Sequence, residues 1–197
     1  MSPNAKATVN VLGALALAVN DQVSASVLEE SGQSESAAAA LSALEQFLDR
    51  PTIDQLRQVL GLTPSGAVRL VDRLSDAGLV VRGAGANGRS RSVALTTKGH
   101  DIALRIASAR EIRLGRLVAG LTTDETDTLH SLLGRVMSNV VDSKDGGAWV
   151  CRLCDLGACG RAAGLCPTAN AASVKYADRQ ARGLSSRSGP ATTTPGE

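Results

Sequence analysis

All four cysteines of the chain fall within sixteen residues near its C-terminal end, in the order Cys151, Cys154, Cys159 and Cys166. The spacing is C-x2-C-x4-C-x6-C. Four thiolates that can converge on one point suit a soft metal, either tetrahedral zinc or an iron–sulfur cluster. Reactive thiols or a reversible disulfide switch are the alternatives. We therefore expect one metal centre on these cysteines, and the sequence leaves its identity, zinc or iron–sulfur, open.

The state of the thiols depends on the compartment, because stable disulfides need an oxidising one. Lys6 precedes the apolar residues 11–19, which have the length of a signal-peptide core. However, the apolar spacing continues through Val19, Val23 and Val27, as in one long helix that passes the candidate cleavage point. No run approaches the 18–20 apolar residues of a membrane span. We therefore predict a cytoplasmic protein with reduced cysteines.

The composition predicts a mainly helical protein. Of the 197 residues 43% are apolar but only 2% are aromatic, so Leu, Val and Ala must fill the core. These aliphatic-rich, aromatic-poor sequences favour helices. Charge is uneven, and residues 51–100 carry seven basic and three acidic side chains. The middle of the chain is therefore its basic part.

Caps and periodicity divide the chain into elements that would position these groups. We predict a mainly α (α+β) fold, with helices at residues 9–28, 34–50, 53–60, 64–77, 97–120 and 123–141 and strands at 79–82 and 90–95. In the fourth helix Val68, Val71 and Leu74 are expected to face inward. The last of these helices carries a continuous apolar stripe, formed by Leu129, Leu132, Leu133, Val136, Met137, Val140 and Val141. Residues 168–182 could form one more short helix.

The order helix, glycine turn, helix, strand, glycine-rich hairpin, strand describes a winged helix-turn-helix. The strings LGLTPSGAVRLVDRLSDAGLVVR and GRSRSVALTTKG resemble the MarR family of bacterial transcriptional regulators. The likeness spans roughly residues 8–144, with its strong motifs at 55–99. The resemblance implies a dimer, most often a repressor, held together by its first and last helices.

The resemblance also places groove-facing positions of the second helix on Ser65, Gly66, Arg69 and Arg73. It places the wing arginine on Arg89, with Arg91 nearby, whereas Asn87 stands where the family usually has an aspartate. With the helix cap, the predicted DNA-binding residues are Thr63, Ser65, Gly66, Arg69, Arg73, Arg89 and Arg91.

The same residues make physical sense without the family. Ser65 and Gly66 leave room for close approach to bases, and Arg69 can reach a guanine edge or a phosphate. Arg73 is expected to meet a phosphate or to pair with Asp72 or Asp76. A homodimer would bind double-stranded DNA at a pseudo-palindromic operator.

We predict three regions. They are a winged-helix domain at 1–144 (DNA-reading unit 52–99, dimerisation helices 8–30 and 97–144), a cysteine-rich metal-binding extension at 145–183, and a disordered tail at 184–197. His100 and His130 are expected to be surface or capping residues rather than ligands. No catalytic motif stands out, so we do not expect an enzyme. A redox, electron-transfer or partner-docking protein is the alternative, and the sequence indicates no small-molecule effector.

Overall fold

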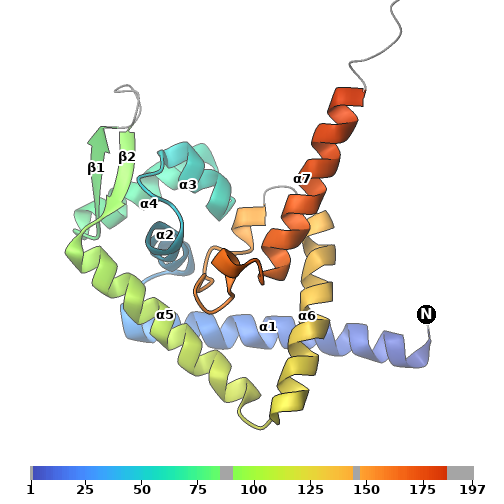
Figure 1. The fold of residues 1–197 in the computed structure, drawn as a ribbon. Coiled ribbons are helices and arrows are strands. Elements are labelled where there is room, and N and C mark those ends of the chain that lie inside the picture. The colour runs from blue at the N-terminus through green and yellow to red at the C-terminus, as the bar shows by residue number, and fades with distance from the viewer. Residues whose placement is uncertain (1, 85–90, 144–146, 186–197) are drawn as a thin grey trace, which may run out of the picture.

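The computed structural model describes residues 2–84, 91–143 and 147–185 (Figure 1). The fold is mainly helical, with one small antiparallel sheet, as the sequence predicts. The elements are α1 (Pro3–Ser31), α2 (Glu35–Gln46), α3 (Ile53–Leu60), α4 (Pro64–Asp76), β1 (Val80–Ala84), β2 (Arg91–Leu95), α5 (Thr97–Val118), α6 (Thr123–Ser143), the short 3-10 helices η1 (Gly147–Trp149) and η2 (Arg161–Ala163), and α7 (Pro167–Ser185).

Local capping defines the helix-turn-helix formed by α3 and α4. Thr52 and Gln55 make a capping box, in which the Gln55 N–H donates to Thr52 Oγ1 over 3.2 Å and the Thr52 N–H donates to Gln55 Oε1 over 2.8 Å. Gly61 ends α3 in the left-handed region, at φ 67°. Thr63 then caps α4, whose first residue is Pro64. The predicted caps of both helices are confirmed.

The wing consists of β1 and β2, paired from Val80 with Leu95 to Ala84 with Arg91. Its base is fixed to the helices, because the Val93 N–H donates to the Pro51 carbonyl over 2.9 Å. Gly99, in the first turn of α5, lies so close to the start of the wing that an added Cβ would be 1.9 Å from the Leu79 carbonyl oxygen. A glycine is therefore required where α5 meets the wing. The predicted turn of the hairpin, at Asn87, lies outside the described residues.

One hydrophobic core joins the DNA-reading helices to α1, α2 and α5. Its fully buried larger side chains come from α2, α3, α4, the sheet and α5: Leu41, Leu56, Leu70, Val71, Leu74, Leu79, Val80, Val93 and Ile106. The alanine-rich α2 is buried at the centre, and its small side chains allow the neighbouring helices to approach closely. Helix α4, the predicted groove-facing (recognition) helix, is thereby held on a rigid support.

The long helix α1 packs along α5 with its C-terminal half, where Val23 and Val27 are buried. A hydrogen bond from Arg113 Nε to Ser26 Oγ, 2.9 Å long, joins the two helices. By length and composition alone α1 could cross a membrane, so the expectation that no segment approaches such a composition is wrong. The same properties occur in core helices of soluble proteins and in signal sequences.

The last two long helices, α6 and α7, pack against each other. A Cβ added at Gly134 of α6 would touch the Pro167 ring at 3.4 Å, and Lys175 Nζ donates to the Val141 carbonyl over 2.6 Å. The helix expected at 168–182 is thus present, but it begins one residue earlier and continues to Ser185. Most of the expected disordered tail, residues 186–197, lies outside the described residues.

Candidate DNA interface and four-cysteine segment

The recognition helix α4 divides cleanly into two faces. Ala67, Leu70, Val71 and Leu74 are buried in the core, at the spacing i, i+3, i+4, i+7. The opposite face presents a row of exposed side chains: Ser65, Val68, Arg69, Arg73 and Asp76. Val68 is 43% exposed. The expectation that Val68 faces inward is therefore wrong, and the buried position belongs to Ala67.

The beginning of α4 is built for close approach to another surface. Thr63 Oγ1 accepts the Gly66 N–H at 3.1 Å, so this predicted residue serves to fix the first turn of the helix. A Cβ at Gly66 would lie 3.0 Å from the same oxygen. The neighbouring Ser65 is exposed beside this compact turn. Small residues thus leave the end of the helix open to a ligand.

The arginines of this region divide into two groups. Arg82, on β1, forms an ion pair with Asp72 of α4, and this bond ties the wing to the recognition helix. Arg73 therefore does not pair with Asp72. Among the described residues, neither Arg69 nor Arg73 has a carboxylate within ion-pair distance. Their exposed guanidinium groups can bind an anionic partner.

Besides the paired Arg82, the described part of the wing contributes one further arginine to this surface. Arg91, the first residue of β2, is exposed and likewise has no carboxylate at ion-pair distance among the described residues. Lys98, by contrast, is engaged, because its Nζ donates to the Ala77 carbonyl over 2.9 Å. The predicted wing residue Arg89 lies outside the described residues.

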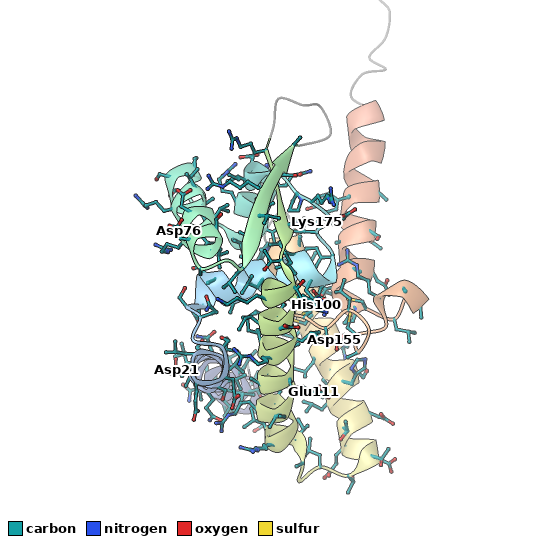
Figure 2. All side chains as sticks on the ribbon, turned by 90° about the vertical axis from the view of Figure 1, so that its left-hand side faces the viewer. Asp21, Asp76, His100, Glu111, Asp155 and Lys175 are labelled. Carbon is teal, nitrogen blue, oxygen red and sulfur yellow. The ribbon has the colours of Figure 1, made fainter. Side chains whose placement is uncertain are left out.

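The two histidines lie on α5 and α6, outside the recognition helix. His100 Nδ1 is 2.7 Å from Glu45 Oε2, in a surface pair between α5 and α2. Figure 2 shows His100 at the beginning of α5, whereas Asp76 lies on the outer side of the DNA-reading unit. His130 is exposed on α6. Both histidines are therefore surface residues, as predicted.

Comparison with known proteins supports this geometry. Residues 31–90 match the model of the MarR family. The crystal structure of MarR from E. coli in its apo form is 28% identical, with a TM-score of 0.53, and covers 64% of this chain and 96% of its own. A MarR family protein from Bacillus stearothermophilus is 20% identical, with a TM-score of 0.64, and covers 71% of this chain and 98% of its own.

The DNA-reading unit of this chain is therefore similar to that of the MarR family. A further structure of this fold is a point mutant of S. aureus MepR bound to an oligodeoxyribonucleotide. It is 19% identical, with a TM-score of 0.50, and covers 68% of this chain and 97% of its own. These structures leave about a third of this chain unmatched. The family match at 31–90 does not reach the cysteines.

The cysteine segment is a compact series of turns between η1 and α7. Cys151 and Cys166, at its two ends, are each only 4% exposed, while Cys154 and Cys159 are partly exposed. The Cys154 N–H donates to the Cys151 carbonyl over 2.9 Å, which is the tight turn expected of a C-x2-C pair. Asp155 Oδ1 accepts the Gly157 and Ala158 N–H groups at 2.8 and 3.0 Å and turns the chain back.

The sulfur atoms interact as two neighbouring pairs. A hydrogen bond from Cys151 lowers the pKa of Cys154 to about 6, burial opposes this shift, and the positive charges of three arginines add to it. The same bond and burial raise the pKa of Cys151. Burial, followed by a hydrogen bond with Cys166, raises the pKa of Cys159. The pairs also affect each other electrostatically, Cys151 with Cys166 and Cys154 with Cys159.

Chemically, the segment offers four thiols near one another in a basic environment. The arginines that act on Cys154 are Arg110, Arg152 and Arg161. Within the described part of the chain, no group of three or more His, Cys, Asp or Glu side chains is already arranged to hold a metal ion. The all-thiolate donor set suits zinc or iron–sulfur. The predicted metal centre therefore stays a prediction.

Proposed function

We propose that this protein is a homodimeric, sequence-specific DNA-binding transcriptional regulator that acts in the cytoplasm as a repressor. Its target is double-stranded DNA with two half-sites related by the two-fold axis of the dimer. The observation that carries the proposal is the outer face of α4. There Arg69 and Arg73 stand exposed with no carboxylate partner in the described chain, next to the open first turn at Ser65 and Gly66.

Each part of this face matches a different feature of duplex DNA. Guanidinium groups bind phosphates or the acceptor edge of guanine, whereas small residues at the start of a helix admit bases and backbone closely. The ion pair of Asp72 with Arg82 keeps the wing at a fixed position beside α4. Arg91 at the base of the wing can then contact the backbone next to the groove that α4 enters.

Apolar side chains exposed on α1 and α6 support the proposal of a dimer. On α1 these are Val9, Val11, Leu12, Leu15 and Leu17, and on α6 they are Leu132, Leu133 and Val136. Figure 1 shows the N-terminal end of α1 extending away from the DNA-reading unit. Apolar surfaces of this extent mark interfaces, because leaving them in water is unfavourable. A second copy of the chain is the partner that the family resemblance implies.

The proposal can be tested with a duplex selected from a random DNA library by the full-length protein. Arg69→Ala is expected to weaken binding by about tenfold, because a good contact to a base edge contributes roughly 1–3 kcal/mol. It should also flatten the dependence of affinity on salt, since fewer counterions are released. Arg105→Ala, which removes an exposed arginine of α5, serves as the matched control. Equal binding by both variants would refute the proposed recognition surface.

We include in this proposal a response to metal or redox state through Cys151, Cys154, Cys159 and Cys166. The support is their proximity to one another and the basic side chains that surround Cys154. Zinc and iron–sulfur are both compatible with the four thiols. Anaerobic purification separates them, because a cluster gives a brown protein with iron and sulfide, whereas zinc gives a colourless one.

A further inference from the structure

We propose that the four cysteines close around one thiophilic metal centre that clamps the α6–α7 pair onto the DNA-reading unit. The centre is then needed for tight operator binding. This inference rests on the proposed function, and it adds the place where the metal acts. It depends on where the cysteine segment lies in the fold.

The segment lies against the back of the helix-turn-helix. The Leu156 N–H donates to Oε1 of Gln46, at the end of α2, over 3.0 Å. Leu153 packs against the central hydrophobic core, and η1 contacts α3. The segment is thus attached to elements that support α4.

A small cavity of about 350 Å³ marks the same junction. Its walls include Gly61, the glycine of the helix-turn-helix, together with Trp149, Arg152 and Leu153 from the C-terminal segment. On the other side, Cys154 is close enough to Arg110 of α5 for the charge to affect its pKa. The cysteine segment thus contacts the end of α2 and the region of α3 and Gly61, and it lies near Arg110 of α5.

The other end of the segment leads directly into the α6–α7 pair. Cys166 is followed by Pro167, the first residue of α7, which packs on Gly134 of α6. Lys175 Nζ adds a hydrogen bond from α7 to the Val141 carbonyl at the end of α6. Among the described elements, α7 is the one against which α6 packs extensively. Besides the chain connection from α5 to α6, the cysteine segment therefore links the α6–α7 pair to the DNA-reading unit.

A metal centre would make this bridge rigid. A metal ion bound by all four cysteines connects the two ends of the segment, because Cys151 precedes its turns and Cys166 follows them. The left-handed glycines Gly160 (φ 61°) and Gly164 (φ 72°) supply the turns that let the two sulfur pairs meet. Four thiols that bind Zn²⁺ release their protons to solvent and leave a site with a net charge of −2. Nearby arginines offset that charge.

Rigidity of the bridge matters because a dimer reads two half-sites at a fixed separation. If α6 contributes to the dimer interface, its position relative to α4 sets the distance between the two recognition helices. Without the metal, the segment has more conformations, and fixing one of them on DNA costs free energy. We expect metal loss to weaken operator binding by about tenfold, a usual magnitude for coupling between two sites.

The test compares Cys159→Ala with Ala158→Ser in the full-length chain. Cys159 is partly exposed, so its replacement should leave the fold intact, and Ala158 is an exposed neighbour in the same turn. We expect anaerobically purified wild type and Ala158→Ser to hold one zinc ion or one iron–sulfur cluster per chain. Cys159→Ala should lose most of the metal and about tenfold in affinity for the selected duplex.

Hydrogen exchange without DNA provides a second readout. Metal removal from the wild type by a chelator should speed exchange in residues 150–166 and in α2 and α3. The proposal is overturned if wild type holds no metal and takes up neither Zn²⁺ nor iron with sulfide. It is also overturned if metal loss changes neither exchange in α2 and α3 nor affinity. A metal-bound chain with this exchange pattern that binds no DNA supports the clamp and refutes only the proposed function.

Discussion

Val68 provides a sharp test of how the recognition helix reads bases. It lies on the outer face of α4, between Ser65 and Arg69, with 43% of its surface exposed. In the major groove, thymine presents a C5-methyl group, and an apolar side chain can contact it. Burying a whole valine side chain contributes about 1.5–3 kcal/mol. Because only the exposed part can be newly buried, Val68→Ala should cost about 1 kcal/mol, or about fivefold in affinity.

The assay pairs this variant with a change in the DNA. Replacing each thymine of the selected duplex in turn by uracil removes one methyl group and leaves base pairing intact. At the contacted position, wild type should lose about fivefold in affinity, whereas Val68→Ala should bind both duplexes equally. Val174→Ala, at an exposed valine of α7, is the matched control and should behave as wild type.

If wild type and Val68→Ala discriminate thymine from uracil equally at every position, Val68 does not contact a methyl group. Loss of folding is not a competing explanation, because the side chain lies outside the core and alanine favours helix more than valine does. The midpoint of thermal unfolding should therefore stay within a few degrees of wild type, which circular dichroism can check.

Three further substitutions test the support of the site. Gly99→Ala places a Cβ 1.9 Å from the Leu79 carbonyl oxygen and should destabilise the fold by about 1–3 kcal/mol, measured by urea unfolding; an unchanged midpoint would contradict the close packing of α5 on the wing. Asp72→Ala frees Arg82 and should lower the midpoint of thermal unfolding slightly while strengthening binding to unrelated DNA, because a carboxylate leaves the binding face; weaker binding would oppose this view. Gln46→Ala removes the oxygen that accepts the Leu156 N–H, so hydrogen exchange in the cysteine segment should become faster. An unchanged exchange rate would contradict this attachment.

Local signals explain what the sequence could predict. The boundaries of α3 and α4 followed from Thr52, Gly61 and Thr63, because a cap acts on neighbouring residues and needs no tertiary contact. The two strands of the wing could be predicted from the alternation of apolar and polar residues and from the glycine-rich segment between them. Exposure is harder to predict, because Ala67 and Val68 are adjacent apolar residues and the larger side chain is the more usual core residue. The i, i+3, i+4, i+7 spacing of Ala67, Leu70, Val71 and Leu74 decides which face of α4 is buried, so side-chain size was the misleading signal.

The docking of the cysteine segment had no local signal. Its hydrogen bond joins Leu156 to Gln46 across 110 positions of sequence, and neither residue belongs to a motif. The spacing of the cysteines indicates which side chains could share a metal, but it carries no information about the surface against which they fold. Distant packing of this kind depends on the shape of the assembled core, here the back of α2 and α3.

The exposed apolar residues of α1 are consistent with the proposed dimer. A helix that buries one stripe in its own chain needs one apolar face, yet α1 carries exposed aliphatic side chains at Val9, Leu12 and Leu15 beyond its contacts with α5. The polar bond of Arg113 with Ser26 and the buried Val27 fix its C-terminal half within the protein. In the proposed dimer, a second copy of the chain covers the remaining apolar half of α1. The same copy supplies the second recognition helix for a palindromic duplex.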